Sequence, residues 1–187
     1  MPLGNETKGE GKPKVNNMGY THYWRRPKEL PVEKWAAFIT DVQAVLENLP
    51  EHSESAGGYH SEDPLIIAGG HAEGDPEINE ERIWTNGGGP GDLGHETCGI
   101  PRVYEPMEYE TPDELGRYSD FCKTARKPYD LFVCSILALF KHHFGDDVRV
   151  GSDGDLEDWT PILPTLNKAL PQRKWNLKLN GDGLKVL

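Results

Sequence analysis

The strongest run of apolar residues in the chain covers residues 131–140, with the sequence LFVCSILALF. Only Ser135 is polar, and a helix that is apolar on nearly every side is a buried helix. Pro128 suits the first helical position because its missing N–H would have no partner there. Gly145 offers a left-handed C-terminal cap. The pattern therefore predicts a buried central helix over residues 128–144.

A second helix is predicted over residues 32–49. Its apolar residues alternate at spacings of three and four, which places them on one stripe of a helix. Pro50 ends the pattern. These positions are 32, 35, 39, 42, 46 and 49. We expect an amphipathic helix that covers one face of a sheet.

Several short segments have the alternation or the apolar character of strands. The last two are separated by Asn-Gly-Asp-Gly, which favours a terminal hairpin. A capping-box pattern predicts a short helix starting at Thr111, and a further short helix starts at Asp155. The expected strands cover residues 19–26, 65–68, 82–85, 96–100, 148–150, 174–179 and 184–187. The fourth is expected to pair back on the third.

These elements predict a two-layer α+β domain, with a mixed or antiparallel sheet of about four to six strands and both main helices packed on it. Residues 1–17 are polar and lack a periodic apolar pattern, so we interpret them as a tail. The domain is expected over residues 18–160. Residues 161–187 then form a C-terminal extension that contains the hairpin.

Composition narrows the classes of partner. The chain has 187 residues and a net charge of −11, which disfavours nonspecific binding to nucleic acid or to an anionic membrane. The apolar run is far shorter than the about 20 residues that span a bilayer. Three cysteines without CxxC spacing, and no signal segment, indicate free thiols in a reducing compartment. We expect a soluble cytoplasmic protein.

The first candidate site is cationic and precedes the central helix. Lys123, Arg126 and Lys127 lie beside the helix N-terminus, whose free N–H groups attract phosphate or carboxylate. Tyr129 could stack on a base or sugar. In a purely structural alternative, Arg126 and Lys127 pair with Asp130 or another carboxylate and seal the helix entry.

Three further residues are expected near this site. His22 lies on the first predicted strand, His95 starts the fourth, and Asp153 follows the strand after the central helix. We expect them to be neighbours of a bound small anionic or nucleotide-like ligand. No cofactor is predicted.

Two motif matches are weak. Residues 89–94 fit GxGxxG formally, but a dinucleotide site needs a helix next, and the following segment is typical of a strand. A wide hairpin loop is the better interpretation. HExxH and paired CxxC motifs are missing, so no zinc site is predicted. Asp153, Asp155 and Glu157 imitate the start of a calcium loop, but Asp158 stands where an EF-hand needs glycine.

Three hypotheses of function follow. The first is the ligand-binding domain just described. The second is a structural or interaction protein without catalytic activity, which self-associates through residues 1–17. The third is a small enzyme that uses His95 or Glu96 as general acid or base. It ranks last because no nucleophile, base and orienting group can be assembled from neighbours in the sequence.

Two segments together carry a resemblance. They are MGYTHYW at residues 18–24 and DFCKTARKPYD at residues 120–130, and the second continues through KHHFGD at 141–146 to SDG at 152–154. They resemble a family of small, uncharacterised proteins from bacteria and bacteriophages. The likeness covers roughly residues 18–160. The resemblance implies a bacterial or bacteriophage source and brings no activity. It implies the cytoplasm of a bacterium or of an infected host cell as the location, with virion association as an alternative. Under the second hypothesis it implies a phage structural or host-interaction protein.

Overall fold

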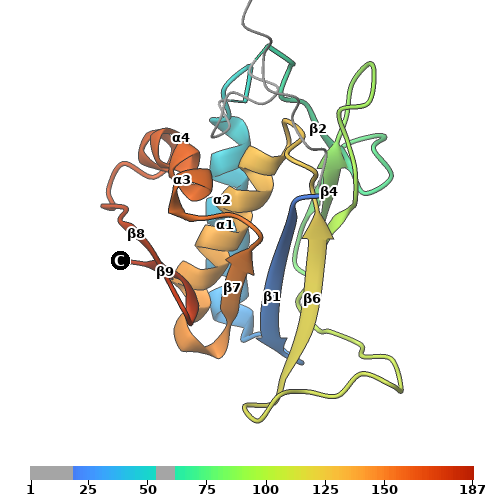
Figure 1. The fold of residues 1–187 in the computed structure, drawn as a ribbon, viewed down its shortest axis with the longest axis vertical. Helices are drawn as coiled ribbons and strands as arrows, with labels where there is room; N and C mark the ends of the chain where they lie inside the picture. Colours follow the sequence, from blue (N-terminus) through green and yellow to red (C-terminus); the bar gives the residue numbers. More distant parts are fainter. Residues whose placement is uncertain (1–18, 54–61) are drawn as a thin grey trace, which may run out of the picture.

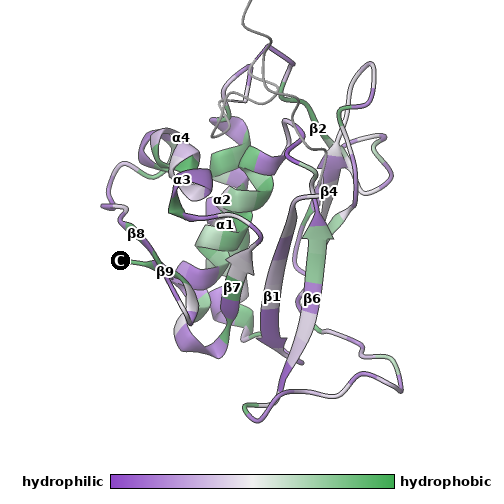
Figure 2. Ribbon diagram, in the orientation of Figure 1, coloured by the Kyte–Doolittle hydropathy of each residue, from purple (hydrophilic) through white to green (hydrophobic). Residues whose placement is uncertain are grey.

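A computed structural model describes residues 19–53 and 62–187, and the helix α2 (Asp130–Phe144) lies at its centre (Figure 1). All side chains from residue 130 to 140 are buried, as the apolar run predicts. The hydrophobic colouring is concentrated on α2 and the helix beside it (Figure 2). The helix starts at Asp130 rather than Pro128. Gly145 ends it with φ 57° and ψ −129°, so the positive φ is confirmed but the left-handed helical cap is not formed.

The predicted amphipathic helix is confirmed as α1 (Val32–Glu47). It packs against α2, and the ring of Phe38 lies 5.6 Å from that of Phe140 and 5.7 Å from that of Phe144. The predicted stripe is confirmed only in part. Trp35, Ile39 and Val42 are buried, Leu46 and Leu49 are half-buried, and Val32 is exposed. Phe38 and Val45, which the predicted stripe did not include, are also buried.

The first sheet contains β1 (Thr21–Pro27), β6 (Arg117–Lys123) and β7 (Arg149–Ser152) in the order β6-β1-β7. Both pairings are antiparallel. The three strands lie side by side next to α2 (Figure 1). Along β1, buried side chains alternate with more exposed ones, and His22 is on the buried face. This alternation brings His22 toward the helices.

The second sheet is built on β4 (Arg82–Gly87), which pairs antiparallel with three short strands. The expectation that the segment after the glycine loop pairs back on this strand is confirmed. The partner strands are β2 (Ile67–Gly69), β3 (Glu77–Ile78) and β5 (Cys98–Pro101).

The C-terminal segment ends in the predicted hairpin and contributes to the same hydrophobic core. Leu166, Leu177 and Leu184 are core members. Asp155 caps the first of its short helices by accepting the Glu157 N–H. The elements from Gly145 onward are η2 (Gly145–Asp147), β7, α3 (Leu156–Trp159), η3 (Thr160–Ile162), α4 (Leu163–Ala169), β8 (Leu177–Asn180) and β9 (Gly183–Val186).

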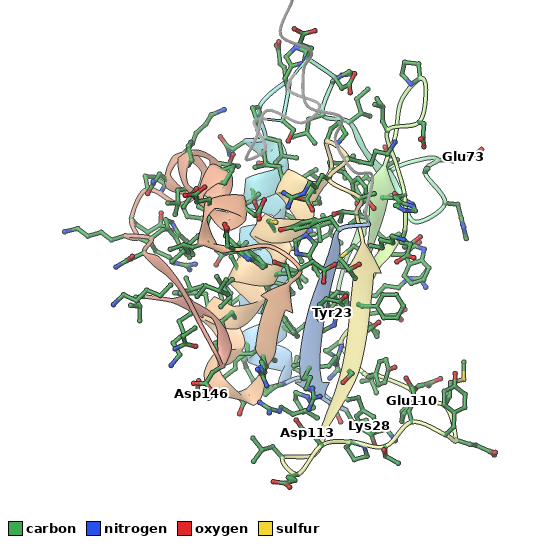
Figure 3. All side chains as sticks on the ribbon, viewed as in Figure 1. Tyr23, Lys28, Glu73, Glu110, Asp113 and Asp146 are labelled. Atoms are coloured by element: carbon green, nitrogen blue, oxygen red, sulfur yellow. The ribbon has the colours of Figure 1, made fainter. Side chains whose placement is uncertain are left out.

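The α+β class is confirmed, while two details differ from the expectation. The strands of the described chain divide into three antiparallel sheets rather than one. The helix expected from Thr111 is absent, because Asp113 uses its side chain to accept the N–H groups of Leu115 and Arg117 in a turn before β6. Asp113 lies at the lower end of the molecule in Figure 3. A local side-chain hydrogen bond therefore replaced a helical turn.

Candidate functional site

The turn between β6 and α2 orients the three predicted cations. The Lys127 N–H donates to the Thr124 carbonyl at 3.0 Å, which closes the turn. Ala125 and Arg126, its two central residues, have positive φ values of 52° and 56°. Such values are uncommon for residues with a Cβ. Arg126 lies beside Asp158, whereas Lys123 and Lys127 line a different hollow.

Lys123, Lys127 and His95 line one hollow of about 310 Å³, which we call the basic hollow. The sequence predicted these three as parts of one site, and the structure brings them together. The Lys127 side chain is 16% exposed, and the Lys123 side chain lies so close to Gly19 that a methyl group added there would clash with it. Its other lining residues are Gly19, Asp92, Gly94 and Ala125.

The basic hollow has an excess of positive charge. Lys127 Nζ donates to Asp92 Oδ2 at 2.7 Å and to the Asp92 carbonyl. The Asp92 side chain is 90% exposed, so water competes for this ion pair. The Lys123 ammonium forms no ion pair with any residue in the described ranges. Two lysines therefore face one exposed carboxylate.

Arg126 and Tyr129 do not line the basic hollow. Arg126 forms an ion pair with Asp158, and its guanidinium lies 4.0 Å from the centre of the Tyr20 ring. Tyr129 is fully buried and donates its hydroxyl to the Glu96 carbonyl at 2.8 Å. Burial raises the pKa of the Tyr129 phenol above its usual range. The expected stacking platform is thus a core residue. The structural alternative, in which these cations pair with a carboxylate, fits Arg126 with Asp158 and Lys127 with Asp92.

Asp153 and Glu96 also lie outside the lining of the basic hollow. Asp153 accepts the Thr21 N–H at 3.0 Å and the Tyr23 hydroxyl at 3.1 Å. Tyr23 is labelled on β1 in Figure 3. Glu96 accepts the Lys123 backbone N–H at 2.8 Å. His95 therefore lines the basic hollow, while the Glu96 carboxylate accepts a backbone N–H outside it. This arrangement does not favour a paired general acid and base.

His22 belongs to a separate group of buried side chains, His22, Thr124, Asp130 and Cys134, which we call the buried polar cluster. His22 Nε2 lies 2.7 Å from Asp130 Oδ1, and the Thr124 hydroxyl donates to the same oxygen. Cys134 Sγ lies 3.7 Å from His22 Nε2 and 3.8 Å from Asp130 Oδ2. His22 Nδ1 is buried and has no hydrogen-bond partner among the described residues. The polar contacts of the imidazole with these residues therefore converge on Nε2.

The buried polar cluster is surrounded by aromatic rings, and its burial affects the reactivity of the Cys134 thiol. The His22 ring makes edge contacts with Tyr20 at 5.0 Å and with Trp159 at 5.4 Å. Burial, followed by the neighbouring Asp130 charge, raises the pKa of the Cys134 thiol well above its usual range. The Arg126 charge acts in the opposite direction but does not reverse the increase in this pKa, so Cys134 is not an activated nucleophile.

The sequence missed the association of Asp130 and Cys134 with His22. Asp130 and Cys134 are four residues apart on α2, which places them on one face of the helix. The strand alternation places His22 on the buried face of β1. The helical spacing and the strand alternation can both be seen in the sequence. The contact between these two faces depends on tertiary packing, so it could not be predicted from residues that are close in sequence.

The glycine loop connects the two strands of a hairpin, which confirms the interpretation of residues 89–94 as a hairpin loop rather than a dinucleotide site. Residues 88–97 join β4 to β5, which pair antiparallel. The next element is a strand, so the helix that a dinucleotide site needs is missing from this position.

A larger hollow of about 950 Å³ lies elsewhere, between α1 and the residues around the end of β5. Its rim carries Glu80, Glu81 and Glu105. The two arginines that line it, Arg82 and Arg102, already pair with glutamates. This hollow does not suit an anion and contains none of the predicted site residues.

Comparisons with models of protein families, with curated proteins and with solved structures found no match. Within residues 19–53 and 62–187, no helix combines the length and apolar character that crossing a membrane requires. The predicted self-association through residues 1–17 lies outside the described residues.

Proposed function

We propose that this protein binds a small phosphate- or carboxylate-bearing ligand in the basic hollow. The observation that carries the proposal is the convergence of Lys123, Lys127 and His95, from two separate segments of the chain, on one hollow of about 310 Å³. That volume lies at the lower end of the about 300–1,000 Å³ range of small-molecule sites. The ligand is therefore small.

The two lysines have different roles. Lys123 has no carboxylate partner in the described ranges, so its ammonium is available for a charge-assisted hydrogen bond. Lys127 would exchange the exposed Asp92 carboxylate for the ligand. His95 is exposed at the edge and contributes one ring N–H donor. Removal of Lys123 should therefore cost more than removal of His95.

A thermal-shift screen tests the proposal with pyrophosphate, a nucleoside monophosphate and citrate as probes. At least one probe should raise the unfolding midpoint of the wild type. Lys123→Ala and Lys127→Ala should remove most of that rise. Lys178→Ala is the matched control, because Lys178 is an exposed lysine on β8. Equal stabilisation of Lys123→Ala and the wild type would refute the proposed site.

A further inference from the structure

The buried polar cluster contains three kinds of metal-ligating group whose donor atoms meet. His22 Nε2, a carboxylate oxygen of Asp130 and Cys134 Sγ all lie within 4.8 Å of one another, and all three residues are buried. We propose that these residues form a binding site for a divalent transition-metal ion of the zinc class. This site is separate from the basic hollow and does not depend on the function proposed for it.

The donor set fits such an ion chemically. Imidazole and thiolate suit zinc and its neighbours in the first transition row, whereas calcium and magnesium take oxygen ligands. One carboxylate completes a three-ligand set of the kind seen in zinc sites with an open fourth position. His22 and Cys134 are both held by packing in the core, so their donor atoms are already placed.

The distances support the same geometry. Ligands about 2.0 and 2.3 Å from a tetrahedral ion lie about 3.5 Å apart. The Cys134 Sγ distances of 3.7 Å to His22 Nε2 and 3.8 Å to Asp130 Oδ2 are close to this value. His22 Nε2 lies 2.7 Å from the other carboxylate oxygen, Asp130 Oδ1, which is a hydrogen-bond distance and is shorter than the about 3.3 Å expected between two ligands of zinc. Metal binding would replace that hydrogen bond and move the two groups slightly apart.

Space also favours an ion. The Asp130 side chain is only 9% exposed, and among the described residues its charge interacts with His22 and with Arg126. A cavity of about 10 Å³ borders both Asp130 and Cys134, which is close to the minimum for one water molecule. That water would be the fourth ligand. The Arg126–Asp158 pair lines the same cavity and is partly exposed, so the cavity lies near the surface.

Titration of the full chain with Co²⁺, after removal of metals by a chelator, tests the proposal. The wild type should bind about one equivalent and develop the intense absorption of a thiolate–cobalt bond. Cys134→Ala should lose that absorption. Cys98→Ala is the matched control, because Cys98 is also a buried thiol but lies outside the cluster. It should keep the absorption.

Two outcomes would overturn the inference. One is a wild type that develops no cobalt–thiolate absorption, which would make the cluster a purely hydrogen-bonded one. The other is an absorption that persists in Cys134→Ala. Circular dichroism establishes that the variant is folded, and Cys134→Ser replaces it if the alanine variant is not. Zn²⁺ should also raise the unfolding midpoint of the wild type and of Cys98→Ala, but not that of the Cys134 variant.

Discussion

Arg26 is a fully buried arginine whose partners are backbone carbonyls. Its guanidinium donates to the carbonyls of Pro27, Pro101 and Arg102, and so ties β1 to the end of β5. Burial lowers the pKa of Arg26 to about 10, which leaves it charged at neutral pH. The planar guanidinium can donate to three separate carbonyls at once, which a lysine ammonium at the end of a flexible chain does less well.

We predict that Arg26→Lys destabilises the fold by roughly 2–3 kcal/mol, because buried carbonyls lose their donors. Arg25→Lys is the neighbouring control at an exposed ion pair, and it should cost less than about 1 kcal/mol. Urea unfolding of both variants measures the difference. Equal stabilities would mean that the carbonyls find other partners.

Asp120 on β6 should make stability fall as the pH rises. Burial raises the pKa of its carboxyl from 3.8 to about 6, although Arg26 on β1 and the Phe121 N–H act in the opposite direction. Glu110 adds to the increase. Between about pH 4 and 6 the folded state keeps a proton that the unfolded state has released. The contribution of Asp120 to stability is therefore highest below about pH 4 and is lost as the pH rises to about 6.

Asp120→Asn should remove this dependence, since the amide oxygen still accepts the Phe121 N–H. The unfolding free energy of the variant relative to the wild type should increase from pH 4 to pH 6 and stay constant above it. Denaturant unfolding at a series of pH values measures this. A constant difference across the window would contradict the raised pKa.

At the scale of elements, Gly145 determines how α2 ends. Its φ of 57° and ψ of −129° lie in a region that residues with a Cβ rarely adopt, and no atom would obstruct an added methyl group. Gly145→Ala should therefore cost roughly 1–3 kcal/mol through backbone conformation alone. Gly181→Ala also places a methyl group in open space but lacks a positive φ, so it should be nearly neutral. Thermal unfolding compares the two variants.

The elements that could be predicted from the sequence are those with a local signal. The apolar run of α2 and the stripe of α1 specify helices without knowledge of their partners. The separation of the strands into three sheets could not be predicted, because strand pairing depends on contacts distant in sequence. Lys123, Lys127 and His95 were correctly placed together, whereas Tyr129 was not, since nothing local to it shows that its hydroxyl reaches the Glu96 carbonyl.

At the scale of the whole molecule, the net charge of −11 should limit stability at low salt. Like charges repel more in the compact state than in the unfolded chain. The screening length falls from about 30 Å at 0.01 M salt to about 10 Å at 0.1 M. The unfolding midpoint at pH 7 should therefore rise between these concentrations. Near the sequence pI of about 5.1 the rise should largely disappear, and an equal rise there would point to another cause.

The same negative charge repels anions, so binding in the basic hollow has to come from its local lysines. Calorimetric titration of pyrophosphate into the wild type and Lys123→Ala is the most direct test of the proposed function. We predict saturable binding to the wild type that weakens by roughly tenfold or more in Lys123→Ala, a change of about 1.4 kcal/mol, and is unchanged in Lys178→Ala. Equal affinities in the wild type and Lys123→Ala, or no binding by the wild type, would contradict it.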